Sequence, residues 1–307
     1  MAFDGLIFSD LFVADTPGES WYKRSANSLD CCSVPGENHG EVATLRGILD
    51  SMPPDPDFKV DFEGMRLRVQ RMDTPNGSIY VCRRYLMPPD SLSALGFPTQ
   101  VSRHLLGKDM KNGLILFTGS PGSGKTTTAM ALLIELLKLY GGVCWTVENP
   151  VEINISGRHG KGICYQTEAL DDSGFGKAIV SMKRASPNFI LVGEIRDEDA
   201  ARQALIAALS GRLVISTFHA NNVTEGLEGY ASLISNRNGL ASAIRAVIHL
   251  ELKPRPSSPN SDEKMLEVQP LLLNGAAESL RAAIRDGNFH MLKSEIERQR
   301  IAFLERH

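Results

Sequence analysis

Two patterns of apolar and polar residues divide the chain. Alternating residues run through Phe58–Phe62 and Met65–Val69, and after a turn at Thr74–Gly77 a further run, Ile79–Tyr85, follows. Alternation with a period of two is typical of strands, and Pro-Asn-Gly between such runs is typical of a hairpin. From about residue 113, short apolar runs alternate instead with residues at helical spacing. This second pattern predicts a largely parallel α/β sheet.

The sequence also predicts a domain boundary in the first third of the chain. A stretch with several prolines and serines, Met87–Pro98, is typical of an interdomain linker. A Pro/Ser-rich loop is expected at 253–260, and beyond it Leu292, Ile296 and Phe303 recur at helical spacing. The predicted organisation is an N-terminal α+β domain over 1–90, a linker and first helix over 91–112, and an α/β domain with a C-terminal helical tail over 113–307.

A complete phosphate-binding motif follows the apolar run Gly113–Thr118. Residues 119–126 read G-S-P-G-S-G-K-T, and a helical pattern extends from Thr127 to Leu139. Glycines let backbone N–H groups surround phosphates, and the following helix N-terminus adds partial positive charge. We expect Lys125 to reach the β- and γ-phosphates and the Thr126 hydroxyl to ligate Mg²⁺, so the motif predicts a site for ATP and Mg²⁺. The residues expected to contact nucleotide are Gly119, Ser120, Pro121, Gly122, Ser123, Gly124, Lys125, Thr126 and Thr127, of which Pro121 lacks an N–H donor.

A phosphate loop needs a carboxylate at the end of a neighbouring strand to hold Mg²⁺ or to position water. The apolar run Phe189–Val192 is followed by Gly193 and Glu194, about 70 residues after Lys125. We therefore expect Glu194 to bind the metal, directly or through water. The alternative is an ordinary surface acid at a strand end.

Two further apolar runs predict strands that end in polar residues. Val143–Val147 leads into Glu148 and Glu152, and two acids beside a nucleotide can supply a general base for water. Leu213–Thr217 leads into His219, whose imidazole is expected to sense the γ-phosphate or to link to Glu194. On spacing alone, a surface histidine after a strand is an equally good interpretation.

Composition limits the remaining function classes. The 307 residues carry a formal net charge of −3, which gives no overall electrostatic case for binding nucleic acid or an anionic membrane. No uncharged apolar run approaches the roughly 18–20 residues of a membrane span, and the acidic start MAFDGLIFSD does not resemble a signal peptide. The five cysteines include no CxxC pair, which favours a reducing cytoplasm, and a metal at Cys31 and Cys32 is disfavoured.

Together these segments resemble the secretion and pilus ATPase superfamily, the hexameric motors of type IV pili, type II secretion and type IV secretion. Residues 119–126 are similar to its Walker A motif, TVENPVE at 146–152 to its acidic box, ILVGEIRD at 190–197 to its Walker B motif, and STFHA at 216–220 to its histidine box. The resemblance implies a RecA-like P-loop NTPase domain with a smaller N-terminal α+β (PAS-like) domain. It also implies that Glu152 is the general base, that Glu194 is the Walker B glutamate and that His219 belongs to the active site.

The N-terminal segment adds to this resemblance. RLRV at 66–69 and Arg83-Arg84 are similar to arginines that the family points at a neighbouring subunit's nucleotide, which implies a catalytic role in trans for Arg66, Arg68, Arg83 or Arg84. Four arginines on a hairpin are otherwise ordinary solvated charges. The implied assembly is a homohexamer, cytoplasmic and peripheral to the inner membrane, that engages a membrane platform protein.

Several positions depart from the family pattern. Asn149 stands where the family usually has aspartate, and Asn188 belongs to Ser-Pro-Asn where Asp-Pro-Asp is common, so both are expected to remove negative charge near the site. The tetracysteine zinc motif of extension motors is missing, and residues 279–287 loosely resemble a stretch of PilT-like ATPases, although an ordinary amphipathic helix would read the same. The sequence thus favours a PilT-like or DotB-like branch and leaves retraction, assembly and secretion open. The alternatives are a regulatory ring subunit with little hydrolysis and a DNA-translocating motor, which the acidic net charge disfavours.

Overall fold

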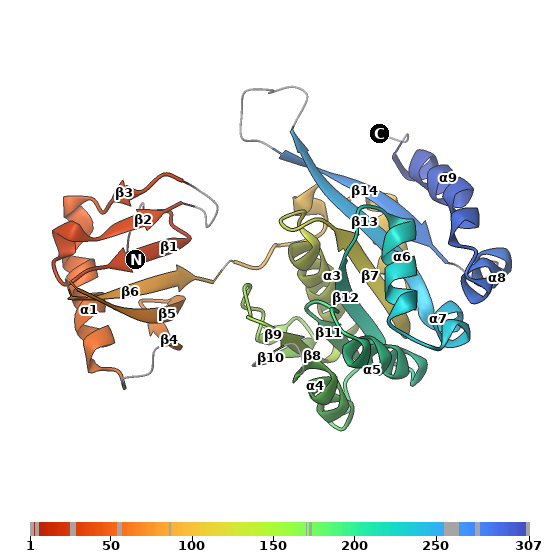
Figure 1. Cartoon of the computed structure of the whole chain (residues 1–307), viewed down its shortest axis with the longest axis horizontal. Helices are drawn as coiled ribbons and strands as arrows, with labels where there is room; N and C mark the ends of the chain where they lie inside the picture. Colours follow the sequence, from red (N-terminus) through yellow and green to blue (C-terminus); the bar gives the residue numbers. More distant parts are fainter. Residues whose placement is uncertain are drawn as a thin grey trace. The chain divides into compact units, whose positions relative to one another are not determined.

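The computed structural model describes residues 3, 6–24, 29–53, 57–75, 77–85, 87–169, 171, 174–254, 264–273 and 277–304. The chain forms two compact units, Met1–Met87 and Pro88–His307 (Figure 1). The first unit ends at Met87, whereas the sequence pattern placed its end at residue 90.

The N-terminal unit contains one antiparallel sheet and one α-helix among its described residues. The sheet order is β3-β2-β1-β6-β5-β4. Its elements are β1 Asp10–Val13, β2 Trp21–Lys23, β3 Cys32–Ser33, α1 His39–Ser51, β4 Asp57–Phe62, β5 Met65–Thr74 and β6 Gly77–Arg84, with short 3₁₀ helices at Pro17–Glu19 and Gly36–Asn38. The predicted hairpins are confirmed, because β5 pairs antiparallel with both β4 and β6.

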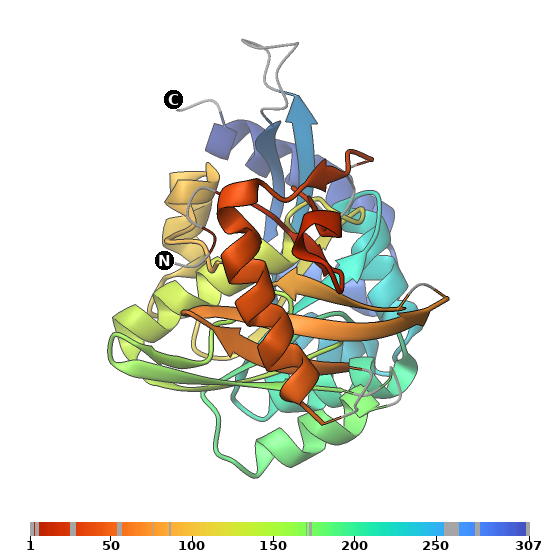
Figure 2. The same cartoon turned by 90° about the vertical axis from the view of Figure 1, so that its left-hand side faces the viewer.

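Helix α1 packs on one face of this sheet, across which it runs in Figure 2. Leu45 and Leu49 of α1 and Leu67 and Val69 of β5 are buried in one apolar cluster. Side chains alternate across a strand, so Arg68, between Leu67 and Val69 on β5, projects from the other face. Arg68 therefore lies on the face of the sheet opposite α1.

The second unit is built on an eight-stranded sheet with the order β14-β13-β7-β12-β11-β8-β10-β9. The strands from β13 to β10 in this order are parallel, and the edge strands β14 and β9 are antiparallel. The strands are β7 Gly113–Gly119, β8 Gly142–Glu148, β9 Gly157–His159, β10 Gly162–Glu168, β11 Phe189–Val192, β12 Leu213–His219, β13 Ile244–Pro254 and β14 Lys264–Leu272. The predicted parallel α/β sheet is thus confirmed.

Helices cover both faces of this sheet. The helices are α2 Thr99–Leu105, α3 Lys125–Tyr140, α4 Gly174–Lys183, α5 Glu198–Leu209, α6 Val223–Ser232, α7 Arg237–Ala243, α8 Glu278–Asp286 and α9 Lys293–Leu304, with 3₁₀ turns at Ser93–Leu95 and Phe289–Leu292. On β7, Ile115 and Phe117 pack with α2 and α3, whereas Leu114 and Leu116 pack with residues of α4 to α8. Because the central strands are buried on both faces, nearly all of their residues are apolar, and they appear in the sequence as continuous apolar runs.

At the C-terminal end one sequence expectation changes and another is confirmed. Lys253 and Pro254, predicted to begin a loop, are the last residues of β13, and their pairing with Met265 and Lys264 continues the antiparallel ladder. The rest of the predicted loop over 253–260 lies outside the described residues. The predicted C-terminal helix is present as α9, where Ile296 is buried.

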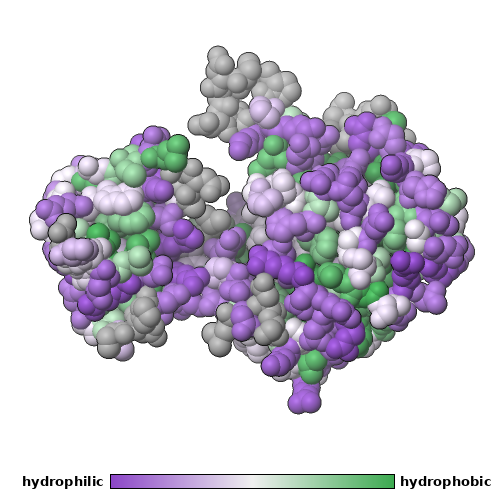
Figure 3. All heavy atoms as spheres, in the orientation of Figure 1, coloured by the Kyte–Doolittle hydropathy of each residue, from purple (hydrophilic) through white to green (hydrophobic). Residues whose placement is uncertain are grey.

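The visible face of the molecule carries mostly hydrophilic residues, with smaller apolar patches between them (Figure 3). Among the helices in the described part of the chain, none combines the length and the apolar character needed to cross a bilayer.

Candidate functional site

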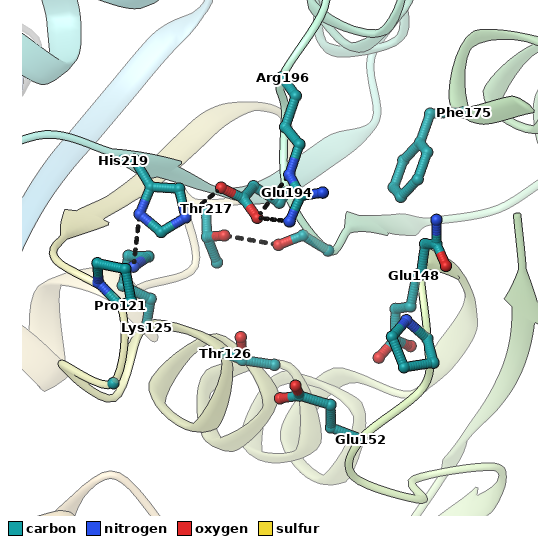
Figure 4. Close-up of a pocket in the computed structure, with 14 residues that line it drawn as sticks. Pro121, Lys125, Thr126, Glu148, Glu152, Phe175, Glu194, Arg196, Thr217 and His219 are labelled. Atoms are coloured by element: carbon teal, nitrogen blue, oxygen red, sulfur yellow. Dashed lines mark hydrogen bonds and ion pairs between the residues drawn. The ribbon is translucent and has the colours of Figure 1, made fainter. Parts of the chain in front are cut away.

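The predicted site residues converge because parallel strands end at the same edge of a sheet. The phosphate loop follows β7, Glu148 ends β8, Glu194 comes two residues after β11, and His219 ends β12. A single pocket at this edge contains residues from all four segments (Figure 4). Its lining residues are Pro121, Gly122, Lys125, Thr126, Glu148, Asn149, Pro150, Glu152, Phe175, Gly193, Glu194, Arg196, Thr217 and His219.

The phosphate loop needs glycine for both conformation and space. Gly124 has a φ of 88° immediately before α3, a conformation that side chains disfavour. Gly119 has a φ of 151°, and a Cβ there would lie 2.4 Å from the carbonyl oxygen of Leu250. Glycine at these positions thus lets the chain turn tightly into the N-terminus of α3, and the free N–H groups of a helix N-terminus can bind phosphate.

Lys125 is held inside the loop that precedes it. Its Nζ donates to the carbonyl oxygens of Gly119 and Ser120, at 2.9 and 2.8 Å. Burial lowers the pKa of this lysine, and the nearby carboxylate of Glu194 opposes that shift. The ammonium is thus already desolvated and lies at the pocket, where an incoming phosphate can replace the backbone acceptors.

A continuous polar network joins Lys125 to Glu194 through His219. Lys125 Nζ lies 3.4 Å from His219 Nδ1, and His219 Nε2 lies 2.5 Å from Glu194 Oε1 (Figure 4). An ammonium group can only donate, so Nδ1 accepts and the ring proton lies on Nε2, which is in close contact with Glu194 Oε1 without hydrogen-bond geometry. The expected link between His219 and Glu194 is therefore formed in this structure.

Arg196 binds the second oxygen of the Glu194 carboxylate. Its Nη2 and Nε donate to Glu194 Oε2 at 2.6 and 3.0 Å. The turn before Glu194 is fixed by Thr217, whose hydroxyl donates to the carbonyl oxygen of Gly193 at 2.6 Å. Arg196 thus bonds to Oε2 of Glu194, and His219 contacts Oε1.

Glu148 differs from Glu194 because it is buried, with 2% of its surface exposed. Its Oε1 accepts hydrogen bonds from Thr146 Oγ1 at 2.5 Å and from Gln166 Nε2 at 2.9 Å. Burial raises the pKa of Glu148 to about 7, the charges of Glu152 and Glu168 add to the increase, and the two hydrogen bonds oppose it. Glu148 therefore exchanges a proton near neutral pH.

The structure brings together most of the residues that the sequence singled out. Pro121, Gly122, Lys125, Thr126, Glu152, Glu194 and His219 line the pocket, while Gly119, Ser120, Ser123, Gly124 and Thr127 form the surrounding loop and helix start. Sequence reasoning did not single out Arg196, Thr217 or Phe175. Arg196 and Thr217 had a signal, because they lie two residues from Glu194 and His219 within the segments quoted above, whereas Phe175 had none.

The four arginines proposed to act in trans belong to the N-terminal unit. Arg66 pairs with Asp61 at 3.2 Å, Arg68 with Asp57 at 2.5 Å, and Arg83 with Asp10 at 2.7 Å. Arg84, at the end of β6, makes no ion pair with any residue that the structure describes. Three of the four are therefore engaged locally, through aspartates of the same unit.

One expectation about charge near the site is wrong. Asn188 precedes β11, whereas Glu194 follows it, and the four residues of β11 alone span about 13 Å at ~3.3 Å each. Its side-chain oxygen accepts a hydrogen bond from the N–H of Val143 at 2.9 Å. Asn188 therefore fixes the opposite edge of the sheet and removes no charge from the pocket. Asn149, by contrast, does line it.

The fold and the site together define a P-loop protein with a RecA-like parallel sheet and a smaller N-terminal α+β unit. Residues 47–288 match the family described as Type II/IV secretion system protein, and the chain belongs to this family. The uncharacterised protein YggR of Escherichia coli K12 is 31% identical over 249 residues, which cover 78% of this chain and 73% of YggR.

Two further comparisons concern a type IV pilus ATPase sequence and a solved structure. The type IV pilus assembly ATPase TfpB of Acinetobacter baylyi is 37% identical over 166 residues, 52% of this chain, and that stretch spans only 27% of TfpB. The crystal structure of the pilus retraction motor PilT with bound ADP matches with a TM-score of 0.75 over 96% of this chain and 87% of that one. At 24% sequence identity, this last match establishes the fold alone.

Proposed function

We propose that this protein hydrolyses ATP with Mg²⁺ as a subunit of a motor for a type IV pilus or a type II or type IV secretion apparatus. The observation that carries the proposal is the network from Lys125 through His219 to Glu194, beside a phosphate loop at the carboxyl edge of a parallel sheet. Support from relatives comes from the family match and from TfpB, a type IV pilus assembly ATPase.

In this proposal the loop and Lys125 hold the phosphates. The N–H groups at the start of α3 and the Lys125 ammonium neutralise phosphate charge in a site with little water, where such contacts are strongest. PilT, whose fold this chain shares, was crystallised with ADP, which supports a nucleotide as the ligand of this protein.

The residues present fit a magnesium ion that is bound partly by the nucleotide. The described residues contain no cluster of three acidic, histidine or cysteine side chains able to hold a metal alone. Mg²⁺ in such sites takes one or two protein oxygens together with phosphates and water. We assign these protein oxygens to the Thr126 hydroxyl and, directly or through water, to Glu194. When bound, the ion would neutralise charge that develops on the phosphates.

Water activation is assigned to the acidic loop after β8. Glu152 is exposed at the pocket and is our candidate for the general base, and Glu194, held by His219 and Arg196, is our candidate for positioning the attacking water. Glu148 is the alternative acceptor, because burial brings its pKa to about 7.

The assembly is also part of the proposal. A homohexamer would let one or two of Arg66, Arg68, Arg83 and Arg84 reach the nucleotide of a neighbouring subunit. We place such a ring in the cytoplasm, at the inner membrane, against a platform protein of the apparatus. Retraction, assembly and secretion remain alternative uses of the same hydrolysis.

A steady-state ATPase assay of the purified oligomer tests the proposed function. We expect Mg²⁺-dependent turnover that Lys125→Ala abolishes. The competing function is a ring subunit that binds nucleotide with little hydrolysis, and Asn149 in the pocket favours it. Tight ATP binding without turnover would establish that alternative, and turnover stimulated by DNA would instead indicate a translocating motor.

A further inference from the structure

Glu152 stands on a loop that lacks regular secondary structure, between β8 and β9. A general base has to be held at a fixed place, because a displacement of about 1 Å can reduce a rate about 100-fold. The question is therefore what fixes this loop. The answer lies on β10, which pairs with β8 in parallel register.

Gln166 of β10 bonds to the loop with both ends of its amide. Its Nε2 donates to the carbonyl oxygen of Ile153 at 2.9 Å, and its Oε1 accepts from the N–H of Ile155 at 2.6 Å and from the Ser156 hydroxyl at 3.2 Å. The same Nε2 donates to the buried Glu148 at 2.9 Å. One side chain thus joins the acid that ends β8 to the backbone immediately after Glu152.

Glu168 holds the other side of Glu152. It lies two residues after Gln166, on the same face of β10, and its Oε1 accepts a hydrogen bond from the N–H of Val151 at 3.1 Å. The two neighbours of Glu152 in the chain, Val151 and Ile153, are therefore both tied to one strand. Ile153 is in addition buried in the apolar core.

We propose that Gln166 and Glu168 are positioning residues that set the place of Glu152 at the nucleotide pocket, with Gln166 also coupling the loop to Glu148. Neither side chain is assigned contact with the nucleotide. The kinetic part of this inference rests on the proposed hydrolysis, whereas the structural part, a loop fixed by β10, does not.

The chain offers a matched control in Gln299 of α9. That glutamine also bonds through both ends of its amide, accepting from the N–H of Leu272 at 2.7 Å and donating to its carbonyl oxygen at 3.0 Å. It is buried, and it attaches α9 to the edge strand β14. Gln299→Ala therefore removes the same chemistry from a part of the fold that the site does not use.

The first measurement is hydrogen–deuterium exchange of the full chain, followed in peptides that cover residues 149–156. We expect Gln166→Ala to accelerate exchange in this loop about tenfold or more, since the N–H of Ile155 loses its acceptor, and Gln299→Ala to leave the loop unchanged. Should Gln166→Ala fail to fold, Glu168→Ala tests the same attachment through the N–H of Val151. Unchanged exchange in the loop, or equal acceleration in the Gln299→Ala protein, would overturn the inference.

The second measurement separates kcat from nucleotide affinity. We expect Gln166→Ala to lower kcat about 10- to 100-fold, as for a displaced catalytic group, while the Kd for a fluorescent ATP analogue changes less than threefold. The Gln299→Ala protein should keep both values. If the loop loosens in Gln166→Ala while kcat stays at the wild-type value, the loop does not place a catalytic group and the inference fails. Absence of turnover in the wild-type protein would instead refute the proposed function, and the exchange experiment would still decide whether β10 fixes the loop.

Discussion

The burial of Glu148 predicts that this protein loses stability as the pH rises. Burial raises the pKa of Glu148 to about 7 from an ordinary value of 4.5. Between these two values the folded protein keeps a proton on Glu148 that the unfolded chain has lost, so the free energy of unfolding falls as the pH increases. The loss begins near pH 4.5 and is complete above about pH 7.

The size of this loss of stability follows from the two pKa values of Glu148. At about 1.4 kcal/mol for each factor of ten, a pKa moved from 4.5 to about 7 corresponds to a destabilisation of about 3 kcal/mol when the carboxylate is ionised. Replacing Glu148 by glutamine removes the titration and keeps a carbonyl oxygen for the hydrogen bonds from Thr146 and Gln166. Relative to wild type, Glu148→Gln should therefore gain about 2–3 kcal/mol in the free energy of unfolding between pH 5 and pH 8.

Tryptophan fluorescence can report on the relevant unit alone. The chain has two tryptophans, Trp21 in the N-terminal unit and Trp145, which lies three residues before Glu148 on β8. Trp21 stacks on Phe12 with ring centroids 3.6 Å apart, so Trp21→Phe retains an aromatic ring there. In that background, urea unfolding at pH 5 and pH 8 measures the stability of the unit that contains Glu148.

The control is an acid without burial. Glu228 on α6 is exposed, and Glu228→Gln should change stability by the same small amount at both pH values. A difference between wild type and Glu148→Gln that stays constant from pH 5 to pH 8 would refute the reasoning. It would mean that Glu148 is hydrated or paired in the folded protein and does not hold a proton near neutral pH.

Three further predictions concern nucleotide chemistry. Lys125→Ala should abolish ATP binding in calorimetry, because the phosphates lose their main cationic partner, and unchanged affinity would count against the site. Glu194→Gln and Glu152→Gln should each retain ATP binding and reduce turnover by about 100-fold or more, with Glu148→Gln milder, and an essential Glu148 would show that the base is assigned to the wrong acid. Removing the charge of Arg66, whose side chain is 44% exposed, should leave folding and ATP binding intact but lower turnover by about 10³ or more. Mixing this variant with Glu194→Gln subunits should restore some activity. Mixed rings that form without recovery of activity would exclude a role of Arg66 in trans.

Much of the fold and part of the site follow from local sequence. The strand β7, the phosphate loop and α3 are contiguous, so the apolar run, the glycines and the helical spacing appear in the order in which they act. Glu194 and His219 were also predictable, because each follows an apolar run and parallel strands end at one edge. Their direct contact was one of two alternatives, and only the coordinates select it.

Other features could not be predicted because they depend on pairing between distant segments. The run of Lys253 and Pro254 resembles a loop in the sequence, but partners on β14 make it a strand. Asn188 seemed close to the site in the sequence, yet it lies at the far end of β11. The pKa of Glu148 has no sequence signal, since it depends on how completely the surrounding strands and loop exclude water.

The order of strands in the sheet, rather than their order in the chain, determines the surroundings of the acids at the pocket. Strand β11 lies between β12 and β8, so Glu194 is placed between the strand that ends in His219 and the strand that ends in Glu148. Arg196 hydrogen-bonds to one oxygen of Glu194, and His219 Nε2 lies 2.5 Å from the other. Glu148 is instead closed in by β10, whose Gln166 also reaches the loop of Glu152. The same edge of the sheet therefore gives three acids different surroundings: Glu194 is bonded to Arg196, Glu148 is buried and Glu152 is exposed at the pocket. The proposed hydrolysis assigns a separate part to each of them.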